Sequence, residues 1–376
     1  MIANTYSRID VKFIKGEGCY LINENGEKYL DFTSGIAVCC LGHSHKKFNN
    51  LLKAQIDKII HTSNLYRILP QEKLAEKIVE NSFADKVFFC NSGAEANEGA
   101  IKLSRKFGKS VSYKKIKILA FENSFHGRTT GALSITGQEK YRKDFTPLLP
   151  EVYFAKFNNI DDVKSKIDED FCAVFIELIQ GEGGVNVVDK NFLLELRKIC
   201  NDLNIMLVYD EVQTGIGRTG KLFCYENFEV EPDVITLAKA LGNGIPIGAI
   251  AGKDKFMQYF TPGSHASTFG GNFLASTAGC AVIDIIKNEN LLENVKKMGN
   301  YLVDNLKKLN FKVKGLGLLI GIETEEISSF DLSKKLFERK ILTVPAGEKV
   351  LRFLPPLIVT EKEIDFLIKN LKEIMR

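Results

Sequence analysis

The feature that most limits the fold of this chain is the alternation of short apolar runs with amphipathic helical patterns. The apolar runs are typical of buried strands, and they are Lys86–Cys90, Ile116–Phe121, Cys172–Leu178, Ile205–Tyr209, Val234–Leu237 and Ala249–Ala251. Helical spacing of three and four occurs in two sets, Phe48, Leu51, Leu52, Ile56, Ile59 and Phe192, Leu193, Leu196, Ile199, Cys200, Leu203. This order predicts an α/β fold, in which a mostly parallel sheet is covered by helices on both faces.

The two ends of the chain have a different character. The beginning shows a hairpin pattern over Cys19–Leu30, with its turn at Asn25 and Gly26. The last third holds a long amphipathic helix, two short strand-like stretches and a closing helix, and these are Leu291–Leu309, Leu316–Ile322, Leu351–Phe353 and the set Ile364, Leu367, Ile368, Leu371, Ile374. These patterns predict a smaller α+β domain.

Length and composition fit a large globular protein. With 376 residues, 45% of them hydrophobic, the chain can bury a full core and form about two domains. We expect residues 1–48 and 280–376 to form the small α+β domain, and residues 49–279 to form the large one. The net charge is only +4 and no basic block stands out, which argues against a nucleic-acid partner.

Nothing in the sequence points to a membrane or to an oxidising compartment. The beginning of the chain lacks an apolar signal region, and no stretch approaches the roughly 18 apolar residues of a membrane span. The eight cysteines include no CxxC pair, and several lie in apolar runs. We expect reduced core cysteines, without a disulfide framework or a metal site, in a cytoplasmic protein.

Two of the apolar runs are followed by side chains that could take part in catalysis. Asp210 follows Ile205–Tyr209, and Lys239 comes directly after Val234–Ala238. In such a sheet, ligands bind outside the carboxyl ends of the strands. A carboxylate and an amine in this position suit pyridoxal phosphate, because the amine can hold the cofactor aldehyde and the carboxylate can keep the ring nitrogen protonated. A solvated carboxylate and a surface lysine would give the same pattern.

Other strand ends also carry polar or glycine-rich loops. Ser92 and Glu95 have the spacing of a capping box that opens a helix, and free N–H groups there can bind a phosphate. Phe125 could stack on a planar ring, and Arg128 could bind a carboxylate with two hydrogen bonds. The loop 180–184 is expected to bring Glu182 near the ring of the bound cofactor. Each feature alone has an ordinary alternative, namely a capped helix, a packing contact, a surface charge or a bare turn.

Seven blocks of sequence resemble the class III aminotransferases of pyridoxal phosphate fold type I. They occur in the family order and span nearly the whole chain: LDFTSGIAVCCLGHSH (30–45), FCNSGAEANEGAIKLSR (89–105), FHGRT (125–129), GEGG (181–184), VYDEVQTGIGRTGKLF (208–223), LAKALGNGIPIGA (237–249) and STFGGN (267–272). The resemblance implies a large domain with a mostly parallel sheet, a smaller α+β domain, and a homodimer with shared active sites.

The resemblance also implies roles for individual residues. Lys239 and Asp210 are the catalytic pair, and the contacts to pyridoxal phosphate come from Gly93, Ala94, Phe125, Asp210, Glu211, Val212, Gln213, Lys239 and Thr268. Thr268 is expected to reach the phosphate in the partner subunit, and Gln213 the ring oxygen. Many relatives have Thr in place of Ala94, so one hydroxyl contact to the phosphate is missing here.

The substrate-binding residues implied by the family are Arg128, Ser267, Arg352 and Glu182. Arg128, with Ser267 of the other subunit nearby, would bind the α-carboxylate of the amino donor. Arg352 would bind the α-carboxylate of glutamate, and Glu182 would neutralise Arg352 when the other donor is bound. A buried arginine without a partner is costly, which favours such a switch.

Within the family the sequence is most similar to the branch that acts on N2-acetyl-L-ornithine. That branch transfers the δ-amino group to 2-oxoglutarate in arginine biosynthesis, giving N-acetyl-L-glutamate 5-semialdehyde and L-glutamate, and in many bacteria it also acts on succinyldiaminopimelate in lysine biosynthesis. The alternatives within the family are ornithine and 4-aminobutyrate aminotransferases. Ornithine enzymes usually have a Tyr at the position of Ile36, which argues against that choice. We expect structural roles for His43, His45 and His126.

Two other classes of protein fit less well. A dinucleotide-dependent dehydrogenase would need a G-x-G-x-x-G loop after its first strand and an acid about 20 residues later, and the chain shows no such loop there. A binding protein without activity, such as a regulator built on this fold, would carry an added DNA-binding domain for which the chain has no room.

Overall fold

A seven-stranded sheet forms the centre of the computed structural model, which describes residues 1–375. Its strands are, in spatial order, β4 (Lys86–Cys90), β12 (Gly248–Gly252), β11 (Val234–Leu237), β10 (Met206–Asp210), β7 (Phe171–Ile176), β5 (Lys117–Phe121) and β6 (Val152–Ala155). Only β12 runs antiparallel to its neighbours β11 and β4. The mostly parallel sheet predicted from the apolar runs is therefore confirmed.

Helices bury both faces of this sheet. Along β10, Met206 and Val208 belong to one buried cluster, whereas Leu207 and Tyr209 belong to a second. Successive side chains of a strand point to opposite faces, so the two clusters lie on the two sides of the sheet. The first cluster includes residues of α4 (Gly93–Val111), and the second includes residues of α8 (Lys190–Asp202).

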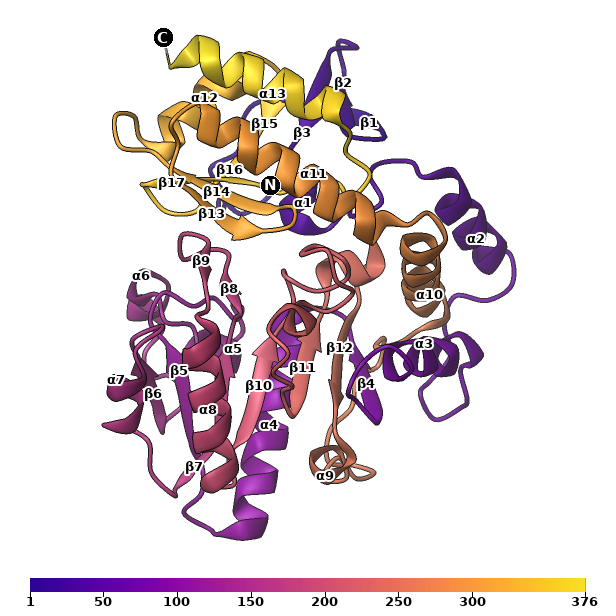
Figure 1. Ribbon diagram of the computed structural model, residues 1–376. Coiled ribbons are helices and arrows are strands. Elements are labelled where there is room, and N and C mark those ends of the chain that lie inside the picture. Colours follow the sequence, from indigo (N-terminus) through magenta and orange to yellow (C-terminus); the bar gives the residue numbers. More distant parts are fainter. Residues whose placement is uncertain (376) are drawn as a thin grey trace.

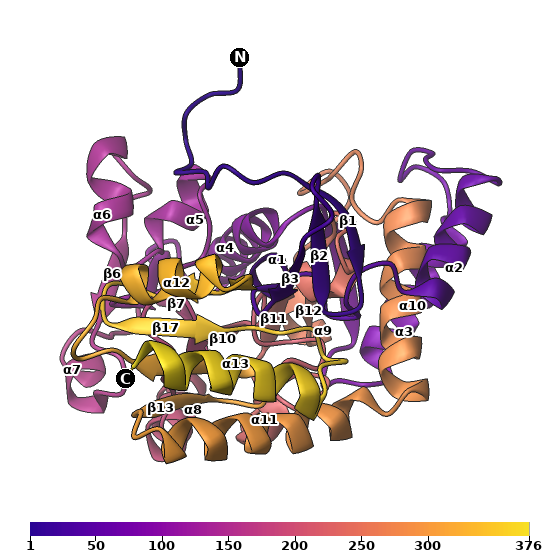
Figure 2. The ribbon, with the colours of Figure 1, turned by 90° about the horizontal axis from the view of Figure 1, so that it is seen from above.

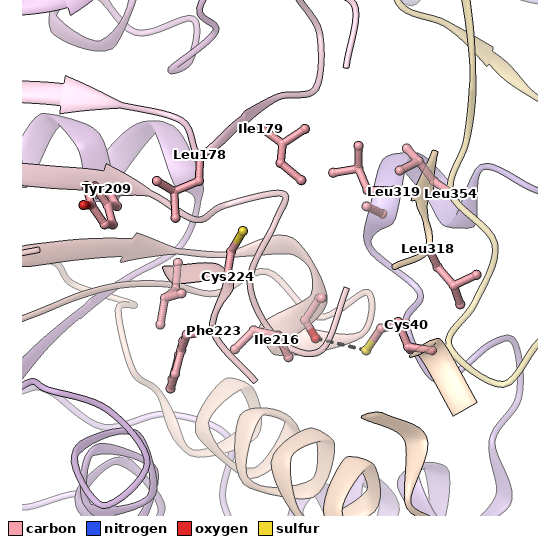
Figure 3. Packing of buried hydrophobic residues seen from close by; sticks show 14 of the residues in the cluster. Cys40, Leu178, Ile179, Tyr209, Ile216, Phe223, Cys224, Leu318, Leu319 and Leu354 are labelled. Carbon is pink, nitrogen blue, oxygen red and sulfur yellow. Dashed lines mark hydrogen bonds between the residues drawn. The ribbon is translucent and has the colours of Figure 1, made fainter. Parts of the chain in front are cut away.

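The second cluster continues beyond the large sheet into the ends of the chain. In Figure 3, Leu178 and Tyr209 of the large-sheet region lie on the left of the view. Cys40, Leu318 and Leu354, from the two ends of the chain, lie on the right. The thiol of Cys40 also contacts the carbonyl oxygen of Ala240 at 3.4 Å. A continuous apolar core therefore joins the large sheet to the segments that cover it.

The first and last parts of the chain pair in smaller sheets. One contains β1 (Phe13–Glu17), β2 (Tyr20–Asn23), β3 (Lys28–Asp31) and β15 (Ile341–Leu342), a second contains β13 (Val313–Leu316), β14 (Leu319–Glu323), β17 (Val350–Phe353) and β16 (Val344–Pro345), and a ribbon is formed by β8 (Ile179–Gln180) and β9 (Asn186–Val187). The expected hairpin is confirmed as β2 and β3, and Gly26 in its turn has φ of 78°. The amino-terminal and carboxy-terminal elements lie together on one side of the large sheet (Figure 1). The division into two folding domains with the stated bounds stays a prediction.

The longer helices outside the large sheet occur at both ends of the chain. They are α2 (Lys46–Ile56), α3 (Leu69–Val79), α10 (Phe273–Asn288), α11 (Leu291–Lys308), α12 (Ser329–Glu338) and α13 (Glu361–Ile374). Short helices occur in the connections, namely α1 (Ser34–Ala37), α5 (Thr130–Ser134), α6 (Glu139–Arg142), α7 (Ile160–Lys164), α9 (Asp254–Met257), η1 (Lys143–Phe145), η2 (Cys224–Asn227) and η3 (Lys239–Gly242). Seen from above, α11, α12 and α13 lie over the large sheet, and the amino terminus extends away from them (Figure 2).

Some predicted elements differ from the structure. The stretch Leu316–Ile322, expected as one strand, contains the turn between β13 and β14, because Gly317 adopts a positive φ of 59° there. The run Cys172–Leu178 forms a strand that already ends at Ile176. Edge strand β6 has no counterpart among the predicted strands. Among residues 1–375, the helices are too short or too polar for any of them to be a candidate membrane span.

Candidate active site

A cavity of about 640 Å³ opens at the carboxyl ends of the parallel strands. Five strands of the large sheet and the loop after β8 contribute to its wall, and the lining residues include Gly93, Ala94, Phe125, Arg128, Glu177, Glu182, Asp210, Val212, Gln213 and Lys239. The structure therefore brings together nine of the residues that the sequence singled out, and adds Glu177. This is the place where an α/β sheet is expected to bind its ligand.

The carboxylate of Asp210 is held rigidly at the end of β10. Its Oδ2 atom lies 2.7 Å from Nδ1 of His126 and accepts a hydrogen bond from Nδ2 of Asn97 at 2.8 Å. Asn97 is held in turn, because its Oδ1 accepts a hydrogen bond from the hydroxyl of Thr236 at 2.9 Å. The other carboxylate oxygen of Asp210 accepts from the N–H of Val212 at 3.0 Å. A buried carboxylate fixed in this way is suited to pair with a cationic ring nitrogen.

The roles of the histidines therefore differ. His126 is buried and contacts Asp210 directly, so it belongs to the site although the sequence suggested only a structural role. His43 pairs with Asp31 at 2.8 Å, and His45 caps α2 by accepting the N–H of Phe48 at 3.3 Å. Neither of the latter two lines the cavity.

The amine of Lys239 is set on the cavity wall in an unusual backbone conformation. Lys239 begins η3 with φ of 44°, a value that a side-chain-bearing residue adopts at a cost of about 1–3 kcal/mol and that often marks a functional position. Burial lowers the pKa of Lys239, and the nearby charge of Arg352 lowers it further, while Glu182, Asp210 and Glu177 oppose the shift. Within residues 1–375 no hydrogen bond occupies the amine, so it is available to a ligand.

Glu177 is the cavity residue that sequence reasoning missed. Its carboxylate accepts the N–H of Phe125 at 2.9 Å, and it is only 7% exposed. Burial and the neighbouring charge of Asp210 raise the pKa of Glu177 well above its ordinary value, so this carboxyl group keeps its proton to higher pH than a free one. The sequence did contain a signal for Glu177, because this residue directly follows the buried strand β7.

A buried ion pair lies at the other side of the cavity. Arg352 on β17 is fully buried, and its Nη2 donates to Oε1 of Glu182 at 2.7 Å. Its Nη1 donates to Oε1 of Gln213 at 2.8 Å. Burial alone would raise the pKa of Glu182, but the charge of Arg352 and the hydrogen bond to it outweigh burial and lower that pKa. The predicted partners Glu182 and Arg352 are therefore in contact.

The amino end of α4 faces the same cavity. The hydroxyl of Ser92 accepts the N–H of Glu95 at 3.2 Å, which confirms the predicted helix start, although the Glu95 carboxylate bonds Asn91. The first N–H groups of a helix have no intrahelical acceptor, so those of Gly93 and Ala94 remain for an anion. A Cβ atom on Gly93 would lie 2.7 Å from the Val212 side chain, so glycine is required where the two loops meet.

Four predicted residues do not line this cavity, namely Arg352, which contacts the lining residues Glu182 and Gln213, and Glu211, Ser267 and Thr268. The Glu211 carboxylate accepts the N–H groups of Cys224 at 2.6 Å and Tyr225 at 2.8 Å, and burial raises its pKa to about 8. The side chain of Glu211 therefore braces the following loop, and its contact to the cofactor stays a prediction. Ser267 contacts Asn91 at 3.2 Å near the rim, and Thr268 is exposed.

Comparisons with known proteins agree with this geometry. The family model for aminotransferase class III matches residues 1–375. The chain is 50% identical to acetylornithine aminotransferase from Aquifex aeolicus over 376 residues, covering 100% of this chain and 99% of that protein. It is 45% identical to acetylornithine aminotransferase from Methanocaldococcus jannaschii, covering 98% and 94% of the two chains.

Solved structures of related enzymes have the same fold. N-acetylornithine aminotransferase from Stenotrophomonas maltophilia matches with a TM-score of 0.86 and 34% identity, covering 98% of this chain and 96% of that one. Ornithine aminotransferase from Toxoplasma gondii, which holds pyridoxal phosphate at partial occupancy, matches with a TM-score of 0.94 and 31% identity, covering 99% and 91%. The chain therefore belongs to the class III aminotransferases, an enzyme family whose cofactor is pyridoxal phosphate.

Proposed function

We propose that the protein transfers the δ-amino group of N2-acetyl-L-ornithine to 2-oxoglutarate, giving N-acetyl-L-glutamate 5-semialdehyde and L-glutamate in arginine biosynthesis. The observation that carries the proposal is the ion pair between Arg352 and Glu182 beside Lys239, with Arg128 left open across the same cavity. Arg352 is paired with Glu182, whereas Arg128 is available to a ligand. This arrangement suits an amino donor with a single carboxylate, placed far from the reacting amine. The acetyl group of the donor is inferred from the similarity of the chain to acetylornithine aminotransferases.

The cavity residues fit pyridoxal phosphate. Asp210 would hold the ring nitrogen, Phe125 would cover one ring face, and the N–H groups of Gly93 and Ala94 would bind the phosphate. The unpaired amine of Lys239 would hold the cofactor covalently. When bound there, the cofactor supplies an aldehyde that takes up the amino group and a ring that withdraws electrons.

Lys239 would also carry the proton transfer. Its Nζ would take a proton from Cδ of acetylornithine in the first half of the cycle and deliver one to C2 of 2-oxoglutarate in the second. A general base works best when its pKa lies near the working pH, and burial lowers the pKa of this amine. Asp210, fixed by His126 and Asn97, would keep the ring nitrogen charged throughout.

The ion pair would let a single site accept two different donors. Acetylornithine presents uncharged carbon beside the reacting amine, so Glu182 would remain on Arg352 and no charge would be left buried alone. Glutamate presents a carboxylate at that place, so it would displace Glu182 from Arg352. Leaving one partner of such a pair uncompensated costs roughly 3–5 kcal/mol, enough to enforce the exchange.

We also propose a homodimer with shared active sites, in which Ser267 and Thr268 reach the site of the partner. The support is a patch of exposed apolar side chains next to these residues, namely Ile59, Ile60, Leu65, Tyr66 and Phe269. Asn64 ties the two loops of this patch together, because its Nδ2 donates to the carbonyl oxygens of Ser267 at 2.9 Å and Gly270 at 3.0 Å. A patch of this kind is typical of a protein interface.

We propose the cytoplasm as the location of the protein. All eight cysteines are free thiols, which suits a reducing compartment.

A panel of amino donors with 2-oxoglutarate as acceptor tests the substrate. Glutamate formation should give the highest kcat/KM with acetylornithine, and ornithine and 4-aminobutyrate should fall at least about tenfold lower, because ornithine lacks the acyl group and 4-aminobutyrate lacks it and is one carbon shorter. Succinyldiaminopimelate belongs in the same panel as the other acylated donor. A higher kcat/KM for ornithine or 4-aminobutyrate would overturn the proposal.

A further inference from the structure

Arg128 lies on the cavity wall without a polar partner of its own. Across residues 1–375, its guanidinium takes part in no hydrogen bond or ion pair, and the side chain is exposed. Arg352, the other arginine of the site, is instead fixed by Glu182 and Gln213. A long side chain that must bind a carboxylate in one geometry needs some other constraint.

Aromatic rings supply that constraint. The guanidinium carbon of Arg128 lies 3.9 Å from the centre of the Tyr141 ring and 5.4 Å from that of Phe125. At 3.9 Å the guanidinium lies over the face of the Tyr141 ring. Stacking of this kind holds the guanidinium plane and leaves the N–H groups at its edge free for a carboxylate.

Tyr141 is itself held in place on the short helix α6. Its ring meets the ring of Phe125 nearly at a right angle, 83° at 5.9 Å between centroids, and its N–H donates to the carbonyl oxygen of Gln138 at 3.1 Å. The Lys140 ammonium also lies 4.8 Å from the Tyr141 ring centre. No hydrogen bond engages the Tyr141 hydroxyl within residues 1–375, so the ring supplies the contact to Arg128.

We propose that Tyr141 is a positioning residue for the distal carboxylate of the substrate, acting through the orientation of Arg128. This inference rests on the proposed function, in which Arg128 binds that carboxylate. Tyr141 does not line the cavity, so it would act on the substrate only through Arg128. Its removal should therefore weaken substrate binding and leave the chemical step intact.

The test compares Tyr141→Leu with Tyr141→Phe, and uses Lys140→Ala as the neighbouring control. An exposed cation–π contact corresponds to roughly a two- to fivefold change in binding. Tyr141→Leu should raise the KM of acetylornithine by about that factor with kcat within about twofold of the starting enzyme. Tyr141→Phe keeps an aromatic ring at this position, and Lys140→Ala leaves the stacking of Arg128 on Tyr141 unchanged, so both variants should retain the original KM. Tyr141→Gln repeats the test if the leucine variant does not fold.

A second donor separates this inference from the proposed function. N-acetyl-1,4-diaminobutane is acetylornithine without its carboxylate, so its KM should not change in Tyr141→Leu. An unchanged KM for acetylornithine in Tyr141→Leu, or an equal rise for both donors, overturns the positioning role. Arg128→Ala should raise the acetylornithine KM more strongly, and if it does not, the assignment of Arg128 in the proposed function is wrong.

Discussion

At the scale of single residues, the site depends on a carboxylate whose position is set by its neighbours. Asp210 and Lys239 were identifiable from the sequence because each follows an apolar strand. Asn97 and His126 were not identifiable as partners of Asp210, since they reach it only through tertiary contacts from α4 and from the loop after β5. Glu211, adjacent to Asp210, points away from the cavity because successive side chains near a strand end alternate.

Replacement of Asp210 tests the residue-scale account. Asp210→Asn removes the charge opposite the ring nitrogen and should lower kcat by on the order of 10²–10³, as the loss of a preorganised electrostatic contact does. The proposed phosphate contacts do not involve this side chain, so cofactor absorbance should remain after gel filtration. Thr236→Val, which breaks only the hydrogen bond to Asn97, should lower kcat by less than about tenfold. Full activity in Asp210→Asn would contradict the assignment.

At the scale of elements, the sequence predicted which segments form strands and helices better than where they end. Burial of one helix face or of a whole strand leaves a clear pattern, as in α8 and β10. The edge strand β6 left little signal, because it is short and only its last residue is fully buried. The direction of β12 depends on the connection between strands, which no apolar run specifies.

The turn at α1 also could not be predicted from local preference. Ser34, Gly35, Ile36 and Ala37 all have positive φ, between 48° and 66°, and a β-branched residue such as Ile36 disfavours that region. Asp31 holds the start of the turn by accepting the N–H groups of Thr33 and Ser34, both at 2.9 Å. Tertiary contacts therefore impose a conformation that the residues themselves oppose.

The pair of Asp31 and His43 should make the stability of this region depend on pH. The hydrogen bond to Asp31, aided by Cys39, raises the pKa of His43 to about 9. A raised pKa stabilises the fold fully below the unfolded value of about 6.5, and this contribution is lost as pH rises through about 9. The upper limit of the effect is about 3 kcal/mol, from 1.36 kcal/mol for each pKa unit.

Urea unfolding at several pH values measures this contribution. The free energy of unfolding of the unchanged protein, minus that of His43→Gln, should fall between pH 6.5 and 9.5. The free energy of unfolding of the unchanged protein, minus that of Asp31→Asn, should fall over the same pH interval, because each variant removes the pair of Asp31 and His43. A difference that stays constant across that interval would show that the pair does not titrate as described.

At the scale of the whole molecule, the proposed shared active site requires two copies of the chain. Phe269 is 60% exposed and lies beside Thr268 in the proposed interface. Phe269→Asp would bury a charge in an apolar contact, so sedimentation should show monomers at micromolar concentration together with loss of most activity. Phe330→Asp changes an equally exposed aromatic residue on α12 and should remain dimeric. A fully active monomer would refute the shared site.

In the proposed function, one cavity serves two donors because Glu182 can pair with Arg352 when no substrate carboxylate does. Single-turnover measurement of both half-reactions in Arg352→Ala, followed by cofactor absorbance, tests this most directly. The account predicts that the rate with glutamate falls by roughly two to three and a half decades, the equivalent of 3–5 kcal/mol, whereas the rate with acetylornithine changes much less. Equal losses with the two donors would contradict the switch and leave Arg352 as a residue that only supports the structure.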